Sequence, residues 1–109
     1  MSENELNKIE IAGTVEEEPT LRYTTNKHVA VTSLRICNTH RKQRCWISAT
    51  CWGSLAEEVC AEFHVGRMVV ITGRLVTESW EDGGIKKSVI KIIADEVEAL
   101  GSEGDDIPF

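Results

Sequence analysis

The feature that most constrains the fold is a period-two alternation of apolar and polar residues, carried largely by β-branched side chains. Such alternation is typical of strands that bury one face. It predicts five strands, at residues 6–16, 28–37, 45–52, 67–80 and 85–100. Residues 81–84, Glu-Asp-Gly-Gly, have the composition of a hairpin turn between the last two strands. Residues 38–44 are expected to form a basic connection between the second and third strands.

A single helix is expected between the third and fourth strands. Ser54 and Glu57 have the spacing of a capping box, and Gly66 is placed to end the helix. The apolar stripe between them comprises Leu55, Val59 and Phe63. Gly13 inside the first strand indicates a bend or bulge, which small barrels need at a corner. The order of three strands, one short helix and two strands predicts an all-β, five-stranded OB-fold barrel, although other small barrels share this count.

A chain of 109 residues has room for one compact domain. We expect the barrel domain at residues 1–100 and a short, flexible, acidic tail at 101–109, where the apolar periodicity ends. No apolar run approaches the ~20 residues of a membrane span, and the acidic start lacks a signal-peptide pattern. We therefore expect a soluble, intracellular chain. The four cysteines form no Cys-x-x-Cys pair and sit among apolar residues, which favours buried thiols over a zinc site or disulfides.

Charge is distributed unevenly along the chain. The formal net charge is -6, but residues 21–53 contain no Asp or Glu. The basic side chains of this segment are Arg22, Lys27, Arg35, Arg41, Lys42 and Arg44. Because a polyanion responds to the local potential rather than to the net charge, the segment is a candidate phosphate-facing surface. A solvated basic surface without a ligand is the alternative.

The third predicted strand carries the most informative side chains. Alternation places Trp46 and Trp52 on one face with two small polar residues between them, whereas the opposite face is aliphatic. Six residues of strand separate the two indoles by about 20 Å. Exposed aromatic rings stack on nucleobases irrespective of sequence. Trp80, beside the lysines of the last hairpin, is a third candidate. Packing of these tryptophans in a subunit interface or under a loop is the alternative.

Residues suited to catalysis or metal binding form no recognisable pattern. None of the three histidines, His28, His40 and His64, has a spaced carboxylate or cysteine partner that would indicate a triad or a metal site. The Gly83-Gly84 pair is a turn signal rather than a phosphate-binding loop. We therefore expect no enzymatic activity, no cofactor and no metal.

Segments spread over most of the chain match a known pattern. They are residues 7–9 (Asn-Lys-Ile), 12–13 (Ala-Gly), 19–23 (Pro-Thr-Leu-Arg-Tyr), 52–57 (Trp-Gly-Ser-Leu-Ala-Glu) and 69–75, with Trp46, Trp80 and the final Asp-Asp-Ile-Pro-Phe. Together these residues resemble the bacterial single-stranded DNA-binding proteins. The resemblance implies an OB fold, normally a homotetramer, that wraps single-stranded DNA without sequence preference.

The resemblance also implies which residues contact DNA. The stacking aromatics of the family correspond to Trp46, Trp52 and Trp80, with a further one near His40, and a basic position of its first strand corresponds to Lys8. We add to these positions the further aromatic and basic side chains that are candidates for contact with bases or phosphates. The expected DNA-binding residues are then Trp46, Trp52, Trp80, Lys8, Arg22, Tyr23, Lys27, Arg35, His40, Arg41, Lys42, Arg44, Arg74, Lys86 and Lys87. The family often carries basic residues around the positions of Ser48, Ser54, Val65, Val76 and Glu78, and this chain does not. Arg35, Arg44, Arg67 and Arg74 are the candidates to take their place.

The last five residues resemble the tip through which this family recruits other proteins. The expected partner-binding residues are Asp105, Asp106, Ile107, Pro108 and Phe109. Two carboxylates suit a basic rim and a terminal aromatic ring suits an apolar pocket. The implied role is protection of single-stranded DNA in replication, recombination or repair, in the cytoplasm at the nucleoid, by a homotetramer or alternatively a homodimer. A primosome-type OB-fold accessory protein and an RNA-binding OB-fold protein remain the alternative functions.

Overall fold

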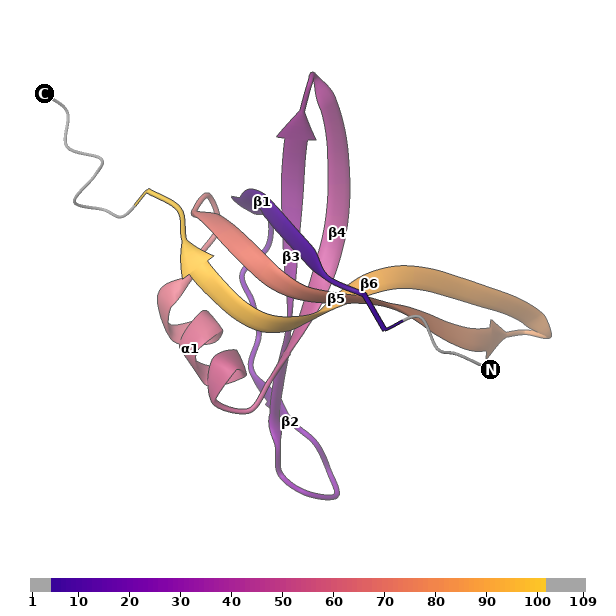
Figure 1. Ribbon diagram of the computed structural model, residues 1–109. Coiled ribbons are helices and arrows are strands. Elements are labelled where there is room, and N and C mark those ends of the chain that lie inside the picture. Colours follow the sequence, from indigo (N-terminus) through magenta and orange to yellow (C-terminus); the bar gives the residue numbers. More distant parts are fainter. Residues whose placement is uncertain (1–4, 102–109) are drawn as a thin grey trace, which may run out of the picture.

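Five strands close into a ring in the computed structural model, which describes residues 5–101 (Figure 1). The elements in chain order are β1 (Ile9–Val15), β2 (Arg22–Tyr23), β3 (Ala30–His40), β4 (Gln43–Trp52), α1 (Ser54–Glu62), β5 (Met68–Asp82) and β6 (Ile85–Ala99). Around the ring the order is β1-β5-β6-β4-β3, and β3 pairs again with β1. The short β2 extends the sheet beyond β3. The predicted OB-fold barrel, with its helix between the third and fourth strands of the ring, is confirmed.

Two glycines allow the ring to close. A Cβ atom on Gly13 would lie 2.8 Å from the carbonyl oxygen of Cys37, where β1 turns from β5 towards β3. A Cβ atom on Gly73 would lie 2.1 Å from the carbonyl oxygen of Ile93, next to a register shift between β5 and β6. Both contacts are with backbone, which does not move aside as a flexible side chain does. Glycine is therefore required at these close approaches.

The barrel core contains the apolar face of each ring strand and one face of the helix. The fully buried side chains include Leu34 and Ile36 of β3, Ile71 of β5 and Ile92 of β6. On α1 the buried residues are Ala56 and Val59, and Phe63 follows the helix into the core. Burying apolar area of this kind is the main favourable contribution to folding. The face of β4 opposite the tryptophans supplies Ala49 and Cys51 to the same core, as the alternation predicts.

The β3–β4 hairpin is longer than the sequence pattern indicates, and it projects from the ring as an arm (Figure 1). The prediction of a connection at residues 38–44 is wrong, because the strands stay paired as far as His40 and Gln43. The turn is only Arg41-Lys42, and both residues have positive φ, 53° and 68°. Positive φ at both central positions is the geometry that matches the twist of a hairpin, although Asn-Gly usually supplies it.

The β5–β6 hairpin forms a second arm (Figure 1). Its turn consists of Gly83 and Gly84, with φ of 61° and 86°, and the strands remain paired up to Asp82 and Ile85. The strand that was expected to end at Trp80 therefore runs two residues further. The tryptophan lies within the paired arm rather than at its end.

The helix begins and ends differently from the prediction. The capping box is wrong, because Gly53 is the N-cap residue with φ of 66° and no side chain caps the first turn. Ser54 is already the first helical residue, so its hydroxyl is one position too late. The helix ends at Glu62, and Gly66 lies in the following turn, where its amide donates to the carbonyl of Val15 at 2.9 Å. The positive φ of Gly66, 93°, serves that turn.

The cysteines are all free thiols, in unequal environments. Cys51 is fully buried, and desolvation, with a smaller contribution from Cys60, raises its pKa to about 12. Cys37 and Cys60 are half-buried, but Cys45 is exposed on the β3–β4 arm, so the prediction of a buried thiol is wrong there. No His, Cys, Asp and Glu side chains within residues 5–101 gather in a group of three that could hold a metal ion. In the same range no helix has the length and apolar character to span a membrane.

Candidate nucleic-acid interface

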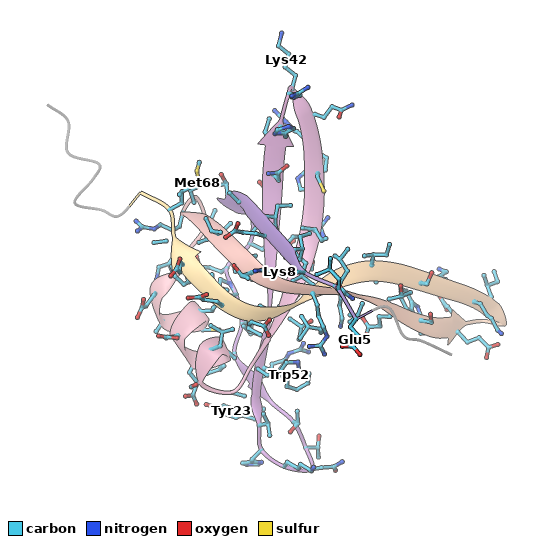
Figure 2. All side chains as sticks on the ribbon, in the orientation of Figure 1. Glu5, Lys8, Tyr23, Lys42, Trp52 and Met68 are labelled. Carbon is cyan, nitrogen blue, oxygen red and sulfur yellow. The ribbon has the colours of Figure 1, made fainter. Side chains whose placement is uncertain are left out.

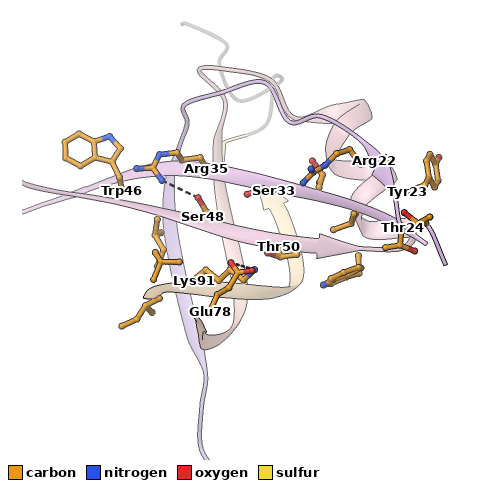
Figure 3. A pocket seen from close by; sticks show the side chains of 17 residues that line it. Arg22, Tyr23, Thr24, Ser33, Arg35, Trp46, Ser48, Thr50, Glu78 and Lys91 are labelled. Atoms are coloured by element: carbon orange, nitrogen blue, oxygen red, sulfur yellow. Dashed lines mark hydrogen bonds and ion pairs between the residues drawn. The ribbon is translucent and has the colours of Figure 1, made fainter. Parts of the chain in front are cut away.

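A groove of about 640 Å³ runs between the outer face of β3 and β4 and the base of the β5–β6 arm (Figure 3). Its β4 side comprises Trp46, Ser48, Thr50 and Trp52, and β6 contributes Lys91. Residues from β2 and the chain after it line one end. The groove therefore joins segments that are far apart in the sequence.

The two tryptophans of β4 face outward, as the alternation predicts. Trp46 is 48% exposed and Trp52 is 47% exposed, whereas Thr50 between them is buried. The β3 partners in register are Cys37 opposite Trp46 and Val31 opposite Trp52. The small side chains between the indoles leave a shallow floor, so the tryptophans stand above it at separate points of the groove. Such half-exposed rings offer π-faces to a ligand.

An arginine of β3 lies between the two tryptophans. Arg35 is opposite Ser48 in the register, and its Nη1 donates to the Ser48 hydroxyl at 3.3 Å. Because Trp46 is the diagonal neighbour of Arg35 across the strands, the guanidinium and the indole are within reach of each other (Figure 3). A hydroxyl partner leaves the charge of the guanidinium uncompensated. This part of the groove therefore presents a cation beside an aromatic ring.

Arg22 and Tyr23 line the other end of the groove (Figure 3). Pairing of β2 with β3 positions them, with Arg22 opposite Val31. Tyr23 is 51% exposed, and its ring lies 6.3 Å from the ring of His28. The loop that follows is held by Thr24, whose hydroxyl accepts from the Val29 amide at 3.0 Å.

Trp80 lies outside this groove, on the β5–β6 arm. It is 46% exposed, is opposite Lys87 in the register, and lines a separate hollow with Lys86 and Lys87. On the arm, Lys87 Nζ lies 3.1 Å from Asp82 Oδ2. Closer to the barrel, Lys91 Nζ lies 3.1 Å from Glu78 Oε1 inside the groove (Figure 3).

The remaining residues predicted to bind DNA lie outside the groove. His40, Arg41 and Lys42 are at the tip of the β3–β4 arm (Figure 2), and Arg44 lines another hollow on the far side of Trp46. The others, away from these hollows, are Lys8 before β1, Lys27 in the β2–β3 loop and Arg74 on β5. The structure thus brings five of the predicted residues together in the groove, namely Arg22, Tyr23, Arg35, Trp46 and Trp52. The predicted partner-binding residues Asp105, Asp106, Ile107, Pro108 and Phe109 lie outside the described residues.

Sequence reasoning missed Lys91 and the neighbouring Val89 as groove residues. Alternation in the last strand indicates that Lys91 faces away from the core, but it does not say what lies across from it. That neighbour is set by the parallel pairing of β4 with β6, which consists of Ala49 opposite Ile92 and Thr50 opposite Ile93. No local signal announces such a long-range pairing.

The charge of the groove is uneven in a way that the sequence does suggest. Among residues 5–101, those that line it with a basic side chain are Arg22, Arg35 and Lys91, and Glu78 is the one with an acidic side chain. The β2–β4 side contains no carboxylate because residues 21–53 have none.

Comparison with known proteins identifies the family. A sequence model of the single-strand binding protein family matches residues 6–100. A single-stranded DNA-binding protein of Deinococcus radiodurans is 36% identical over 105 residues, which cover 87% of this chain and 34% of that protein. One of Corynebacterium glutamicum is 32% identical over 101 residues, or 82% of this chain and 44% of the relative. One of Clostridium tetani is 28% identical over 102 residues, with 87% and 70% covered respectively. The chain belongs to the single-strand binding protein family.

Proposed function

We propose that the chain binds single-stranded DNA along the groove, with bases stacked on Trp46 and Trp52 and phosphates near Arg22 and Arg35. The observation that carries the proposal is the pair of half-exposed indoles flanking Arg35 on the β2–β4 side of the groove, where residues 21–53 contain no carboxylate. Stacking contributes ~1–3 kcal/mol per base and cations attract the backbone, so the two groups together bind a single strand.

The geometry favours binding without sequence preference. The indoles stand about 20 Å apart along the strand, so each stacks a different base. The floor between them consists of short hydroxyl side chains at Ser48 and Thr50 rather than a shaped pocket for one base edge. Because every base has a π-face, stacking of this kind tolerates any sequence.

The expected residues outside the groove extend the proposed path. Arg44 continues it past Trp46 towards the tip of the β3–β4 arm, where His40, Arg41 and Lys42 lie. Trp80 and Lys86 offer a contact on the other arm, in a hollow that Lys87 also lines. Lys8, Lys27 and Arg74 stay candidates for phosphate contacts of a strand that wraps around the barrel.

We extend the proposal to the role of the whole chain. Residues 1–100 form the DNA-binding domain and residues 101–109 form a tail whose Asp-Asp-Ile-Pro-Phe tip recruits replication and repair proteins. The protein is non-catalytic and protects single-stranded DNA in the cytoplasm at the nucleoid. Support for the tip comes from its chemistry, since carboxylates suit a basic rim and phenylalanine suits an apolar pocket.

Assembly into a homotetramer, or a homodimer, is part of the proposal. β1 pairs with β5 along its length but with β3 only at Thr14 and Val15. Within residues 5–101 no strand pairs with the rest of that second edge, between Ile9 and Gly13, where the Asn38 side-chain amide donates to the Ala12 carbonyl at 2.7 Å. An open edge is a template for pairing with another copy. Sedimentation at micromolar concentration tests this, and a monomer of 12.1 kDa would contradict it.

Alanine substitution of the groove tryptophans tests the site. Trp46→Ala and Trp52→Ala should each weaken binding of a labelled oligo(dT) by about 5- to 150-fold, the equivalent of ~1–3 kcal/mol. The matched control is Trp52→Phe, which keeps a π-face and should retain most of the affinity. Fluorescence anisotropy of the label measures binding independently of the tryptophans. Unchanged affinity in both folded alanine variants would contradict the stacking surface, and equal affinity for oligo(U) would favour an RNA-binding role.

A further inference from the structure

The β5–β6 arm carries two lysines on the face that continues the groove, and each is ion-paired with a carboxylate of the same arm. Lys91 Nζ lies 3.1 Å from Glu78 Oε1, and Lys87 Nζ lies 3.1 Å from Asp82 Oδ2. The register places Trp80 opposite Lys87, between the two carboxylates along β5. The aromatic ring is thus flanked by two neutral pairs rather than by two free cations.

The opposite side of the groove differs. Within residues 5–101, neither Arg22 nor Arg35 has a carboxylate at ion-pair distance, and the guanidinium of Arg35 donates to the neutral hydroxyl of Ser48. Two uncompensated guanidinium groups therefore face an arm whose lysines on this face are both compensated. The groove has a cationic side formed by β2–β4 and a neutral side formed by β5–β6.

We propose that the carboxylates of Glu78 and Asp82 take the place of DNA phosphates beside Lys91 and Lys87. They thereby silence these lysines, in the sense that neither lysine contacts a phosphate of the bound strand. The phosphates of a bound strand then follow the β2–β4 side, and the β5–β6 arm contributes the ring of Trp80 rather than the charges of Lys87 and Lys91; Lys86 lies outside these two pairs. The inference rests on the proposed function, because it assigns the course of the strand within the proposed groove. It gives Glu78 the role of setting how strongly the groove responds to salt.

The physical reason is a competition for one cation. A phosphate that approaches Lys91 meets a lysine already paired at 3.1 Å, and it is repelled by the carboxylate of Glu78. Lys91 is only 22% exposed, which limits its freedom to swing to a second partner. A lysine that neutralises a carboxylate of the protein releases no counterion from DNA. A lysine that neutralises a phosphate of a single strand does so, and contributes roughly -0.7 to the slope of log affinity against log salt concentration.

The carboxylates of Glu78 and Asp82 are not required for the stability of the fold. Exposed ion pairs contribute ~0–1 kcal/mol to folding, and the paired carboxylate side chains are 55% and 64% exposed. Removing their charge should therefore leave the barrel folded. This separates an effect on binding from an effect on structure.

The test is a salt titration of oligo(dT) binding for the wild-type chain, Glu78→Gln and Glu78→Gln with Asp82→Asn. Each freed lysine should steepen the slope by about 0.7, so affinity falls about fivefold more per tenfold increase in salt. Affinity at low salt should rise with each substitution. Adding Lys91→Met to Glu78→Gln should remove that variant's gain.

The matched control is Glu98→Gln, which removes the same charge from an exposed position of β6 outside the groove. If Glu78→Gln and Glu98→Gln have the same slope, the proposed silencing of Lys91 is overturned. Failure of the underlying function is a different result, in which the wild-type chain itself does not bind oligo(dT). Far-UV circular dichroism of each variant checks that the barrel is intact.

Discussion

Replacing Gly73 by alanine should destabilise the barrel strongly, because the new methyl group would collide with backbone. The added Cβ would lie 2.1 Å from the carbonyl oxygen of Ile93 and 3.0 Å from a methyl group of Ile92. The carbonyl belongs to β6, which is paired with β5 on both sides of this point. Relief therefore requires the two longest strands to separate at the register shift.

The magnitude follows from the cost of overpacking, typically 1–3 kcal/mol and occasionally more. We expect Gly73→Ala to lower the free energy of unfolding by about 3 kcal/mol, because the nearest atom to the new methyl group is a backbone oxygen and not the end of a flexible side chain. For a domain of this size that corresponds to a fall of about 12–24 °C in the unfolding midpoint. Gly13→Ala should cost less, since its Cβ would be 2.8 Å from the carbonyl oxygen of Cys37. Thermal unfolding followed by circular dichroism, at one fixed protein concentration, measures both.

The matched control is Gly83→Ala in the turn of the β5–β6 arm. That glycine has φ of 61° and no atom within 4 Å of an added Cβ, so alanine meets only the left-handed backbone penalty of about 1 kcal/mol. If Gly73→Ala costs no more than Gly83→Ala, the reasoning about ring closure is refuted.

Three further predictions concern the turn of the other arm, a surface ion pair and the thiols. Replacing Arg41–Lys42 by Asn-Gly should stabilise the protein by about 1 kcal/mol in chemical denaturation, because both positions have positive φ; no gain would contradict this. The His64–Glu18 hydrogen bond lowers the pKa of Glu18 from 4.5 and raises the pKa of His64 from 6.5. Stability lost in His64→Ala should therefore be largest between pH 4.5 and 6.5, shrinking below and above, and a pH-independent loss would refute the pairing. Cys45 should react with an aromatic disulfide reagent in the folded state while Cys51 reacts only after unfolding, and equal rates would contradict their different burial.

The sequence predicts the barrel well because each ring strand and the helix have a local signal, whereas the two-residue β2 is not predicted. Alternation locates the five ring strands, and the apolar stripe that includes Val59 locates the helix. The errors fall where local signals are weak or misleading. The Arg41-Lys42 turn has neither glycine nor asparagine, so nothing in its composition announces a tight hairpin. The capping box is misplaced by one residue because Gly53, with its positive φ, takes the cap position.

The candidate site is predictable in part for the same reason. Ser48 and Thr50 mark the outward face of β4, and with it Trp46 and Trp52. The placement of Lys91 beside them is not predictable, because it depends on the short parallel pairing of β4 with β6. Ion pairs within the β5–β6 arm depend on the register of a hairpin whose turn was expected to be wider. The sequence pattern therefore does not predict which distant strands pair, or in which register they pair.

Photo-cross-linking tests the central claim most directly. A short oligo(dT) carrying 5-iodouracil would be bound to the full chain, irradiated and digested with trypsin, and cross-linked peptides would be identified by mass spectrometry. Cleavage after Arg44 and Arg67 yields peptide 45–67 with both Trp46 and Trp52, whereas Trp80 falls in peptide 75–86. The groove predicts cross-links in peptide 45–67, centred on its two tryptophans. The absence of any cross-link from peptide 45–67 would contradict the stacking of bases on Trp46 and Trp52.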